Sequence, residues 1–394
     1  MKILLAEPPY RTDYPPLGLL KISRFHKERG DSVDFVKGLS AGHASLRWDR
    51  VYVSSLFTCN WTSVVRTLRF YSPAVEKPSR DLFAGGPLAS LLGHELERAV
   101  SCRAVKGIID SAARIGLEGG DIDALLPDYN IIADGGPYAC LKNAYIASAT
   151  RGCPARCEFC SVREVDPRCV EYLPVAEQIA NASSSLGKRD NIIFLDNNVA
   201  QSPFLDAIVE EILSAGFGRG ERKGWVDFSQ GFEPALFSGR TGEKRADSLS
   251  RLPLSPVRLA WDALHEKEIY SNAVAVFASR GFSRFSTPLL YGFSDSPSDM
   301  FFRLEGIVSL ERDLGISIQG IPMGYVGPLR KRRPSGRERA AEWGISEQET
   351  LEFLKYMKKV PSLERGNLDQ FYEIFGSRGE VFQKKLGSGG KACL

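Results

Sequence analysis

The sequence lacks the features that mark membrane and secreted proteins. Its 394 residues contain no run of about 18 apolar residues, so no membrane-spanning segment is expected. The first residues, MKILLAEPPYRTDYPP, contain neither the long apolar segment nor the small-residue cleavage site of a secretion signal. Basic residues outnumber acidic ones by only three, 51 against 48, which does not by itself indicate a nucleic-acid or membrane partner. We expect a cytoplasmic protein.

Several common catalytic signatures are also missing. The sequence has no Walker-type loop, no Gly-x-Gly-x-x-Gly fingerprint and no Gly-x-Ser-x-Gly elbow. It has only four histidines, and no two of them stand at metal-binding spacing. His26 and His94 fall on predicted helices, where we expect them at the surface. These absences argue against nucleotide-phosphate loops, serine hydrolases and histidine metal centres.

Composition and periodicity indicate a globular α/β protein of two or three domains. Hydrophobic residues make up 43% and charged residues 25% of the chain. In residues 1–115, predicted strands at 2–6, 32–36, 51–57 and 82–84 alternate with helices at 17–29, 61–71 and 88–100. Strands separated by helices of this length predict a flavodoxin-like parallel sheet with right-handed crossovers.

The rest of the chain divides into three further predicted segments. Residues 116–143 are rich in glycine and proline and are predicted to be a linker. Residues 144–327 resume the strand–helix rhythm, with strands at 144–149, 192–195, 224–228, 257–261, 284–291 and 316–321. Six such units predict an open, partial (β/α)6 barrel with its chemistry at the carboxyl ends of the strands. Residues 328–394 form a C-terminal extension, with a predicted helix at 345–359 and a flexible Gly/Ser/Lys tail around 387–390.

The cysteines carry the strongest functional signal. Three of the eight, Cys153, Cys157 and Cys160, form a Cys-x3-Cys-x2-Cys loop after the first strand of the second series. Thiolates are the usual ligands of iron–sulfur clusters, and three of them leave one iron of a four-iron cluster open for substrate. A structural zinc site with Cys169 as fourth ligand, or unrelated buried thiols, are the alternatives.

Residues 150–160, TRGCPARCEFC, resemble the signature of the radical S-adenosylmethionine (radical SAM) superfamily. The resemblance implies that Cys153, Cys157 and Cys160 ligate a [4Fe–4S] cluster whose fourth iron is chelated by the methionine part of SAM. Reductive cleavage of SAM would then give a 5′-deoxyadenosyl radical, and Phe159 would lie beside the adenine. The electron would come from a reductant protein such as flavodoxin or ferredoxin.

Polar residues follow the later predicted strands, where a partial barrel opens. The candidates for binding SAM or substrate are Asp196, Asn197, Asn198, Gln230, Glu233, Asp262 and Gly292. In the family the place of Asp196 contacts the SAM amine, and the two asparagines could bind substrate. Strand-end turns and helix caps, where Asp and Asn are common, are the alternative.

The N-terminal segment is similar to cobalamin-binding domains that precede radical SAM cores. Its Ser54-x-Leu56 sequence is followed at the next strand end by Gly85 and Gly86. In that pattern, small residues let the nucleotide tail of cobalamin pass between strands. Pro15 stands where the pattern has the histidine that binds cobalt from below, and proline has no such lone pair. Cobalamin held without a protein histidine and an empty retained scaffold both remain open.

The segment RKRRPSGRER at 330–339 holds six cations and one acid. Such a run can bind phosphates, although a solvated loop is more common and no aromatic residues are interleaved with it. The favoured prediction is a radical SAM enzyme that abstracts a substrate hydrogen, with or without methyl transfer from cobalamin. Without cobalamin, we expect a rearrangement, an oxidation or another group transfer. The alternative from a different class is an iron–sulfur nucleic-acid-binding protein without turnover.

Overall fold

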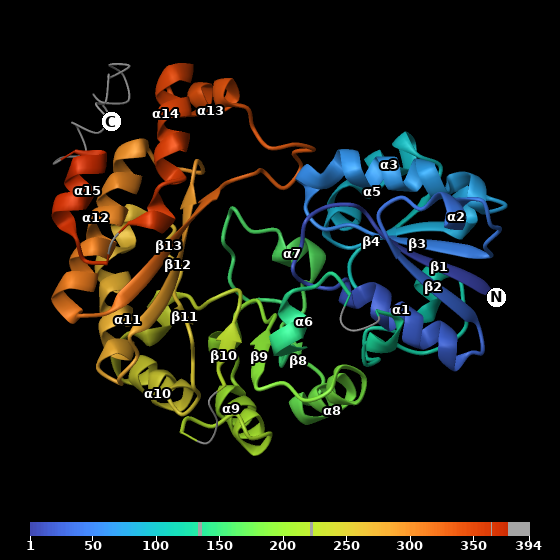
Figure 1. Ribbon diagram of the computed structural model, residues 1–394, viewed down its shortest axis with the longest axis horizontal. Coiled ribbons are helices and arrows are strands. Elements are labelled where there is room, and N and C mark those ends of the chain that lie inside the picture. The colour runs from blue at the N-terminus through green and yellow to red at the C-terminus, as the bar shows by residue number, and fades with distance from the viewer. Residues whose placement is uncertain (133–135, 221–223, 364, 377–394) are drawn as a thin grey trace. The chain divides into compact units, whose positions relative to one another are not determined.

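A computed structural model describes residues 1–132, 136–220, 224–363 and 365–376 (Figure 1). The tail at 387–390, Cys393 and the Asp134-Gly135 pair of the predicted linker lie outside these residues. The chain divides into two compact units, Met1–Ile193 with Gly327–Arg333, and Phe194–Val326 with Pro334–Leu394. Within the described residues, no helix has the length and apolarity needed to span a bilayer.

The first unit begins with a parallel sheet, as the sequence predicts, although the sheet has five strands where four were predicted. Its strand order is β2-β1-β3-β4-β5. The strands are β1 (Lys2–Glu7), β2 (Ser32–Lys37), β3 (Arg50–Ser54), β4 (Leu82–Gly85) and β5 (Arg103–Val105). The short β5 is an element that the periodicity did not reveal. This order is that of flavodoxin-like folds, whose ligand crevice lies at the carboxyl ends of β1 and β3.

Helices cover both faces of this sheet because its strands are apolar on both sides. Leu4 and Val51 pack on the side of α3 (Trp61–Tyr71) and α5 (Pro87–Ala99), whereas Ile3 and Tyr52 pack on the side of α1 (Leu17–Glu28). Figure 1 shows α1 and the α3–α5 pair on opposite faces. The shorter helices α2 (Ala41–Ala44) and α4 (Pro78–Asp81) lie in the connections. Strands buried on both faces are typical of parallel sheets.

The predicted linker has little regular structure but packs tightly. Its described part contains η4 (Tyr129–Ile131) and α6 (Cys140–Asn143), and η3 (Ala112–Ile115) precedes it. Ile122, Tyr129, Tyr138 and Leu141 are all buried. These apolar anchors hold an irregular segment against the first unit, which glycine and proline content alone does not predict.

The first unit continues through the start of the second strand series. It contains β6 (Ala144–Ala147), β7 (Thr150–Arg151), α7 (Val162–Val165), β8 (Val170–Glu171) and α8 (Val175–Leu186), and it ends within β9 (Asn191–Phe194). Strands β7 and β8 pair antiparallel and form a small hairpin. All the residues between these two strands, including the three motif cysteines, therefore belong to the loop of that hairpin.

The second unit carries the later strand–helix pairs. Its strands are β10 (Val226–Phe228), β11 (Val257–Arg258), β12 (Arg284–Tyr291) and β13 (Ser317–Gly324), and β11, β12 and β13 pair in parallel. The helices are α9 (Leu205–Ser214), α10 (Gly239–Leu249), α11 (Lys267–Ala278) and α12 (Pro297–Leu314). Helix α10 begins at Gly239, two residues after the end of η7 (Pro234–Phe237). Gly242 permits this, because a Cβ there would lie 2.2 Å from the backbone carbon of Phe237.

The C-terminal extension folds onto the second unit as three helices. They are α13 (Gly336–Trp343), α14 (Glu347–Met357) and α15 (Leu368–Phe375), with η9 (Val360–Ser362) between the last two. Phe353 and Met357 of α14 are buried, as its apolar spacing predicts. On α15, Phe371 packs against Phe301 of α12 with ring centroids 5.2 Å apart.

Candidate functional site

The cysteine motif lies in the loop of the β7–β8 hairpin. Thr150 pairs with Glu171 and Arg151 with Val170, so residues 152–169 form the loop. Cys157 and Cys160 are exposed, and Cys153 is half-buried. The N–H of Cys160 donates to the carbonyl of Cys157 at 3.1 Å, which closes a turn and keeps the two residues close together. Phe159, between them, is half-buried.

Gly152 anchors the start of this loop. Its N–H donates to the carboxylate of Asp166 at 3.1 Å, and its φ of +70° is a conformation that favours glycine. A Cβ at Gly152 would lie 1.9 Å from the carbonyl oxygen of Arg168. The two ends of the loop are thus in direct backbone contact. Burial raises the pKa of Asp166, whose other oxygen, Oδ1, has no hydrogen-bond partner in the part of the chain that the structure describes.

The donor set of the loop suits an iron–sulfur cluster in type and accessibility. Three thiols stand within eight residues, two of them exposed, on a loop whose ends are fixed. Among the described residues, no three Cys, His, Asp or Glu side chains converge on one point, Cys169 included. The loop supplies the ligands and their spacing, and convergence of the sulfurs requires the irons that they bind.

Polar residues after β9 lie in a buried strand-end loop of the second unit. Asp196 and Asn198 are buried, with 2% and 9% exposure, whereas Asn197 is half-buried. The amide nitrogen of Asn198 donates to Gln201 at 3.2 Å. Its Oδ1 is buried and has no partner within the described residues. A buried acceptor without a donor is costly, so this atom is a candidate contact for a ligand.

Acidic groups gather after β11 in the same unit. Burial, the neighbouring carboxylate of Glu266 and the more distant one of Glu233 raise the pKa of Asp262 to about 6, although Arg303 opposes the shift. Glu233 and Gln230 are exposed on the loop after β10, and Gln230 donates to Ser229 at 3.3 Å. The structure therefore brings Glu233 and Asp262 near each other.

Gly292, a predicted contact, and Asp227 of β10 both make contacts within the chain. Gly292 has a φ of +75°, and its carbonyl accepts a hydrogen bond from buried Arg339 at 2.8 Å. A Cβ at Gly292 would lie 2.0 Å from the Arg339 guanidinium. Asp227, on β10, is held by Arg258 through two hydrogen bonds of 2.6 and 2.8 Å. Gly292 remains a predicted cofactor contact, now with an arginine of the basic segment beside it.

The carboxyl edge of the N-terminal sheet is closed by side chains of this chain. The hydroxyl of Tyr10 lies 3.2 Å from Ser54 Oγ. At the end of β1, Glu7 is 1% exposed, and its carboxylate accepts hydrogen bonds from Tyr138 and Lys37. Burial raises the pKa of Glu7, while those two donors oppose the shift.

Gly85 and Gly86, the glycine pair of the cobalamin pattern, lie in close backbone contact with residues of the same chain. A Cβ on Gly86 would lie 2.2 Å from the carbonyl oxygen of Ser55. Ser55 Oγ donates to the Gly85 carbonyl at 2.8 Å, and the Leu88 N–H donates to the carbonyl of Leu56 at 2.9 Å. The strand ends are therefore drawn together where the pattern requires room for a nucleotide tail. With Pro15 in the place of the histidine, the residues present do not fit a cobalamin whose cobalt is bound from below by the protein.

One histidine expectation is wrong and the other is confirmed. His26 is fully buried on α1, where Nδ1 lies 2.7 Å from Asp31 and Nε2 lies 3.1 Å from the Tyr52 hydroxyl. It is a satisfied core residue, because α1 turns that face onto the sheet. The side chain of His94 is 97% exposed.

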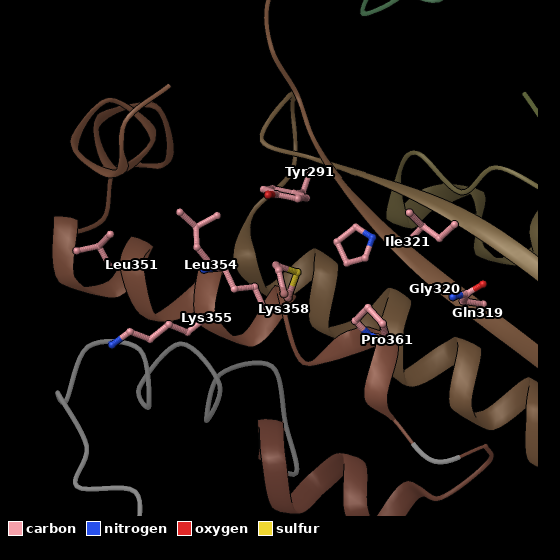
Figure 2. A pocket seen from close by; sticks show the side chains of 11 residues that line it. Tyr291, Gln319, Gly320, Ile321, Leu351, Leu354, Lys355, Lys358 and Pro361 are labelled. Carbon is pink, nitrogen blue, oxygen red and sulfur yellow. The ribbon is translucent and has the colours of Figure 1, made fainter. Parts of the chain in front are cut away.

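The second unit also contains a groove between α14 and β13. Its volume is about 730 Å³. Figure 2 shows side chains of α14 on one side and residues of β13 on the other, with Tyr291 between them. Its lining is largely apolar, and Lys355 and Lys358 supply the charge. Leu354, expected to bury against the barrel, lines this groove.

The sequence did not reveal a cluster of four polar and charged side chains at the base of the cysteine loop. Lys21, Asp123, Arg151 and Tyr172 contact one another in the first unit. Only Arg151 adjoins the motif. Their separations along the chain, up to 151 residues, carry no spacing signal that could have revealed the group.

Comparisons with known proteins support the architecture. No protein-family profile matches the chain, and no curated protein has a similar sequence. Among solved structures, the cobalamin-dependent radical SAM enzyme OxsB, with aqua-cobalamin and SAM bound, matches with a TM-score of 0.54 and 11% identity. A second OxsB structure, with aqua-cobalamin alone, matches with a TM-score of 0.55 and 12% identity. SuiB of Streptococcus suis reaches only 0.37 over 55% of this chain, too low to support an argument.

The OxsB matches cover 93% of this chain, which spans only 56% to 57% of the OxsB chain. At this identity the likeness concerns the fold. The predicted fold class is confirmed: this chain shares the fold of the OxsB structures over 93% of its length, with a flavodoxin-like parallel sheet followed by a partial barrel and a C-terminal extension.

Proposed function

We propose that this protein is a radical SAM enzyme. The observation that carries the proposal is the Cys-x3-Cys-x2-Cys loop, held at both ends by the β7–β8 hairpin and placed after the first strand of a partial barrel. The OxsB-like fold supports it. The protein is a cytoplasmic enzyme on this proposal, reduced by a flavodoxin or ferredoxin.

Each predicted residue then has a chemical task. Cys153, Cys157 and Cys160 hold three irons of a [4Fe–4S] cluster and leave one for the amine and carboxylate of SAM. A cluster held there would supply the electron for reductive cleavage of SAM, so that the enzyme could abstract a hydrogen atom from its substrate. Asp196 accepts hydrogen bonds from the SAM ammonium, and Phe159 packs on the adenine.

Other polar groups of the second unit serve SAM or the substrate. The buried Oδ1 of Asn198 needs a donor, which a hydroxyl or ammonium of the ligand supplies. Asn197, Gln230, Glu233 and Asp262 make a polar environment for SAM hydroxyls and a polar substrate. Gly292, in the loop after β12, lies against the guanidinium of Arg339 and would contact SAM through its backbone.

The fate of the substrate radical distinguishes two versions of the enzyme. Methyl transfer requires cobalamin held by the N-terminal sheet, through Ser54, Leu56, Gly85 and Gly86. The contacts of Tyr10 with Ser54 and of Gly86 with Ser55 favour the other version, in which the reaction is a rearrangement, an oxidation or a different group transfer. We therefore assign no step to cobalamin.

Anaerobic reconstitution with iron and sulfide, followed by SAM and dithionite, tests the proposal. We expect 5′-deoxyadenosine and methionine from the native chain, and none above background from Cys157→Ser. Cys169→Ser is the matched control, since Cys169 is also exposed on the loop but lies outside the motif. An iron-loaded native chain that forms no 5′-deoxyadenosine, or a fully active Cys157→Ser variant, would overturn the proposal.

One specific observation favours a second candidate function, the binding of nucleic acid. The sequence shows no aromatic residues among the cations at 330–339, yet the Lys331 ammonium lies 4.1 Å from the centre of the Trp61 ring. Trp61 itself is half-buried, and Phe57, four residues before it in an extended conformation, is 66% exposed. Cations beside exposed aromatic rings suit single-stranded nucleic acid. Oligonucleotide binding that weakens with salt and with Phe57→Ala would support this candidate, whereas no binding at low salt would refute it.

A further inference from the structure

A single carboxylate, that of Asp123, holds the residue that leads into the cysteine loop. Arg151 is the last residue of β7 and lies two positions before Cys153. Its guanidinium donates from Nε to Asp123 Oδ2 at 3.2 Å and from Nη2 to the other carboxylate oxygen. The side chains of Asp123 and Arg151 are 12% and 28% exposed. A two-point contact of this kind fixes the orientation of the arginine as well as its position.

Asp123 also connects this arginine to the N-terminal sheet. Lys21, on α1, is 5% exposed, and its ammonium contacts both the backbone carbonyl and the carboxylate of Asp123. Burial lowers the pKa of Lys21 to about 8, and the Asp123 carboxylate opposes that shift. Two cations, from elements far apart in the chain, thus share one nearly buried anion.

Tyr172, next to the second strand of the hairpin, contacts both Asp123 and Arg151. It follows β8, and its N–H donates to the Ala149 carbonyl at 2.9 Å. Its hydroxyl donates to the Asp123 backbone carbonyl and accepts from Arg151 at 3.0 Å. The guanidinium of Arg151 lies 4.3 Å from the centre of the Tyr172 ring, a cation–π distance. Both strands of the hairpin are therefore attached to Asp123.

We propose that Asp123 is a positioning residue for the [4Fe–4S] cluster, because it fixes the base of the cysteine loop on helix α1. The proposal rests on the proposed function for the identity of the cluster. It also gives the N-terminal sheet a role other than holding cobalamin, namely to support the hairpin from which the three thiols extend.

Loss of the Asp123 charge leaves Lys21 and Arg151 side by side without an anion. Breaking a buried pair by removing one partner is strongly destabilising, because the remaining charge is uncompensated. Without the Asp123 charge, the cations of Lys21 and Arg151 would repel each other and move apart. The hairpin would move with Arg151. The loop between β7 and β8 would then sample more conformations, and fewer chains would present three thiols together for iron.

The experiment compares Asp123→Asn with Asp128→Asn. Asp128 is the matched control because it is 3% exposed, comes from the same segment and also binds α1, through Ser23 at 2.6 Å and Lys27 at 2.7 Å. No contact found for Asp128 in the described residues reaches the hairpin. The measurements are amide hydrogen exchange of residues 152–169 before reconstitution, iron and sulfide per chain after it, and the electron paramagnetic resonance signal of the reduced cluster.

We expect Asp123→Asn to speed exchange in the loop by about tenfold and to lower iron per chain roughly twofold or more, while Asp128→Asn leaves both near native values. Arg151→Lys, which keeps the charge but not the two-point contact, should give the same result in milder form if Asp123→Asn does not fold. Equal effects of the two aspartate variants, or an unchanged loop in Asp123→Asn and Arg151→Lys, would overturn the proposal.

The two proposals fail in different ways. If the native chain binds iron but forms no 5′-deoxyadenosine, the enzyme proposal fails, and loop exchange and iron content still test Asp123. If the native chain is active but the loop is indifferent to Asp123, only the positioning role fails.

Discussion

Gly152→Ala is the perturbation whose effect follows most directly from the structure. The new Cβ would lie 1.9 Å from the carbonyl oxygen of Arg168, 2.6 Å from its carbon and 2.9 Å from the carbonyl oxygen of Asp166. All three are backbone atoms, so no flexible side chain can move aside. The residue must also keep a φ of +70° or give up its hydrogen bond to Asp166.

Two separable contributions set the magnitude. A left-handed conformation costs a non-glycine residue about 1–2 kcal/mol. Overpacking against fixed neighbours typically adds about 1–3 kcal/mol. Gly30→Ala is the matched control, because Gly30 has a φ of +80° at the end of α1 and no atom within 4 Å of a built Cβ. The difference between the two variants therefore measures the clash alone.

The assays are the thermal unfolding midpoint and the iron content after anaerobic reconstitution. Gly30→Ala should lower the midpoint by a few degrees, at about 2–4 °C per kcal/mol for units of this size, and leave iron unchanged. Gly152→Ala should open the loop locally, so its iron content should fall even where the midpoint falls little more than in the control. Equal iron content in the two variants would refute the close contact of Gly152 with Arg168.

Three further outcomes follow from particular contacts. The reconstituted native chain should retain no cobalamin when purified with hydroxocobalamin supplied, and the absorption bands of one bound cobalamin per chain would contradict the closed edge. Asp262→Asn should stabilise the second unit by at most about 3 kcal/mol at pH 8 and have little effect at pH 4. The sign follows because folding raises the pKa of Asp262 to about 6. The raised pKa stabilises the folded chain fully only below the pKa of the unfolded chain, and this stabilisation is lost as the pH rises through 6. Equal effects of Asp262→Asn at both pH values would count against this reasoning. Arg258→Ala should cost about 3 kcal/mol by stranding buried Asp227, against less than about 1 kcal/mol for Arg251→Ala at the exposed pair with Glu210, and comparable urea midpoints would refute that difference.

Local patterns predicted the elements well because they are set by neighbours in the sequence. The apolar spacing from Leu19 to Phe25 marks a helix, and Gly30, with its positive φ, marks where it ends. The cysteine loop was equally visible, since its ligands stand within eight residues. Such features need no knowledge of which distant segment lies beside them.

The features that the sequence did not reveal depend on distant contacts. His26 looks like an exposed helical residue until Asp31 and Tyr52 are found beside its ring. Asp123 reads as one of several polar residues in a glycine-rich segment, and its importance appears only when Lys21 and Arg151 converge on it. Neither arrangement has a period, so hydrophobic patterns cannot predict it.

The carboxyl edge of the N-terminal sheet has internal contacts where the cobalamin-binding pattern places its ligand. Its strand order places the crevice at the ends of β1 and β3, and there half-buried Tyr10 contacts Ser54 while Glu7 accepts a hydrogen bond from Tyr138. A buried carboxylate that already accepts from Tyr138 and Lys37 gains little from a new ligand and would lose both bonds to admit one. Helix α1 packs on this sheet, and its Lys21 contacts Asp123. Through Asp123 the cysteine loop is attached to α1. On this argument the sheet serves to support the cysteine loop. Similarity of fold to OxsB does not imply that this chain binds cobalamin.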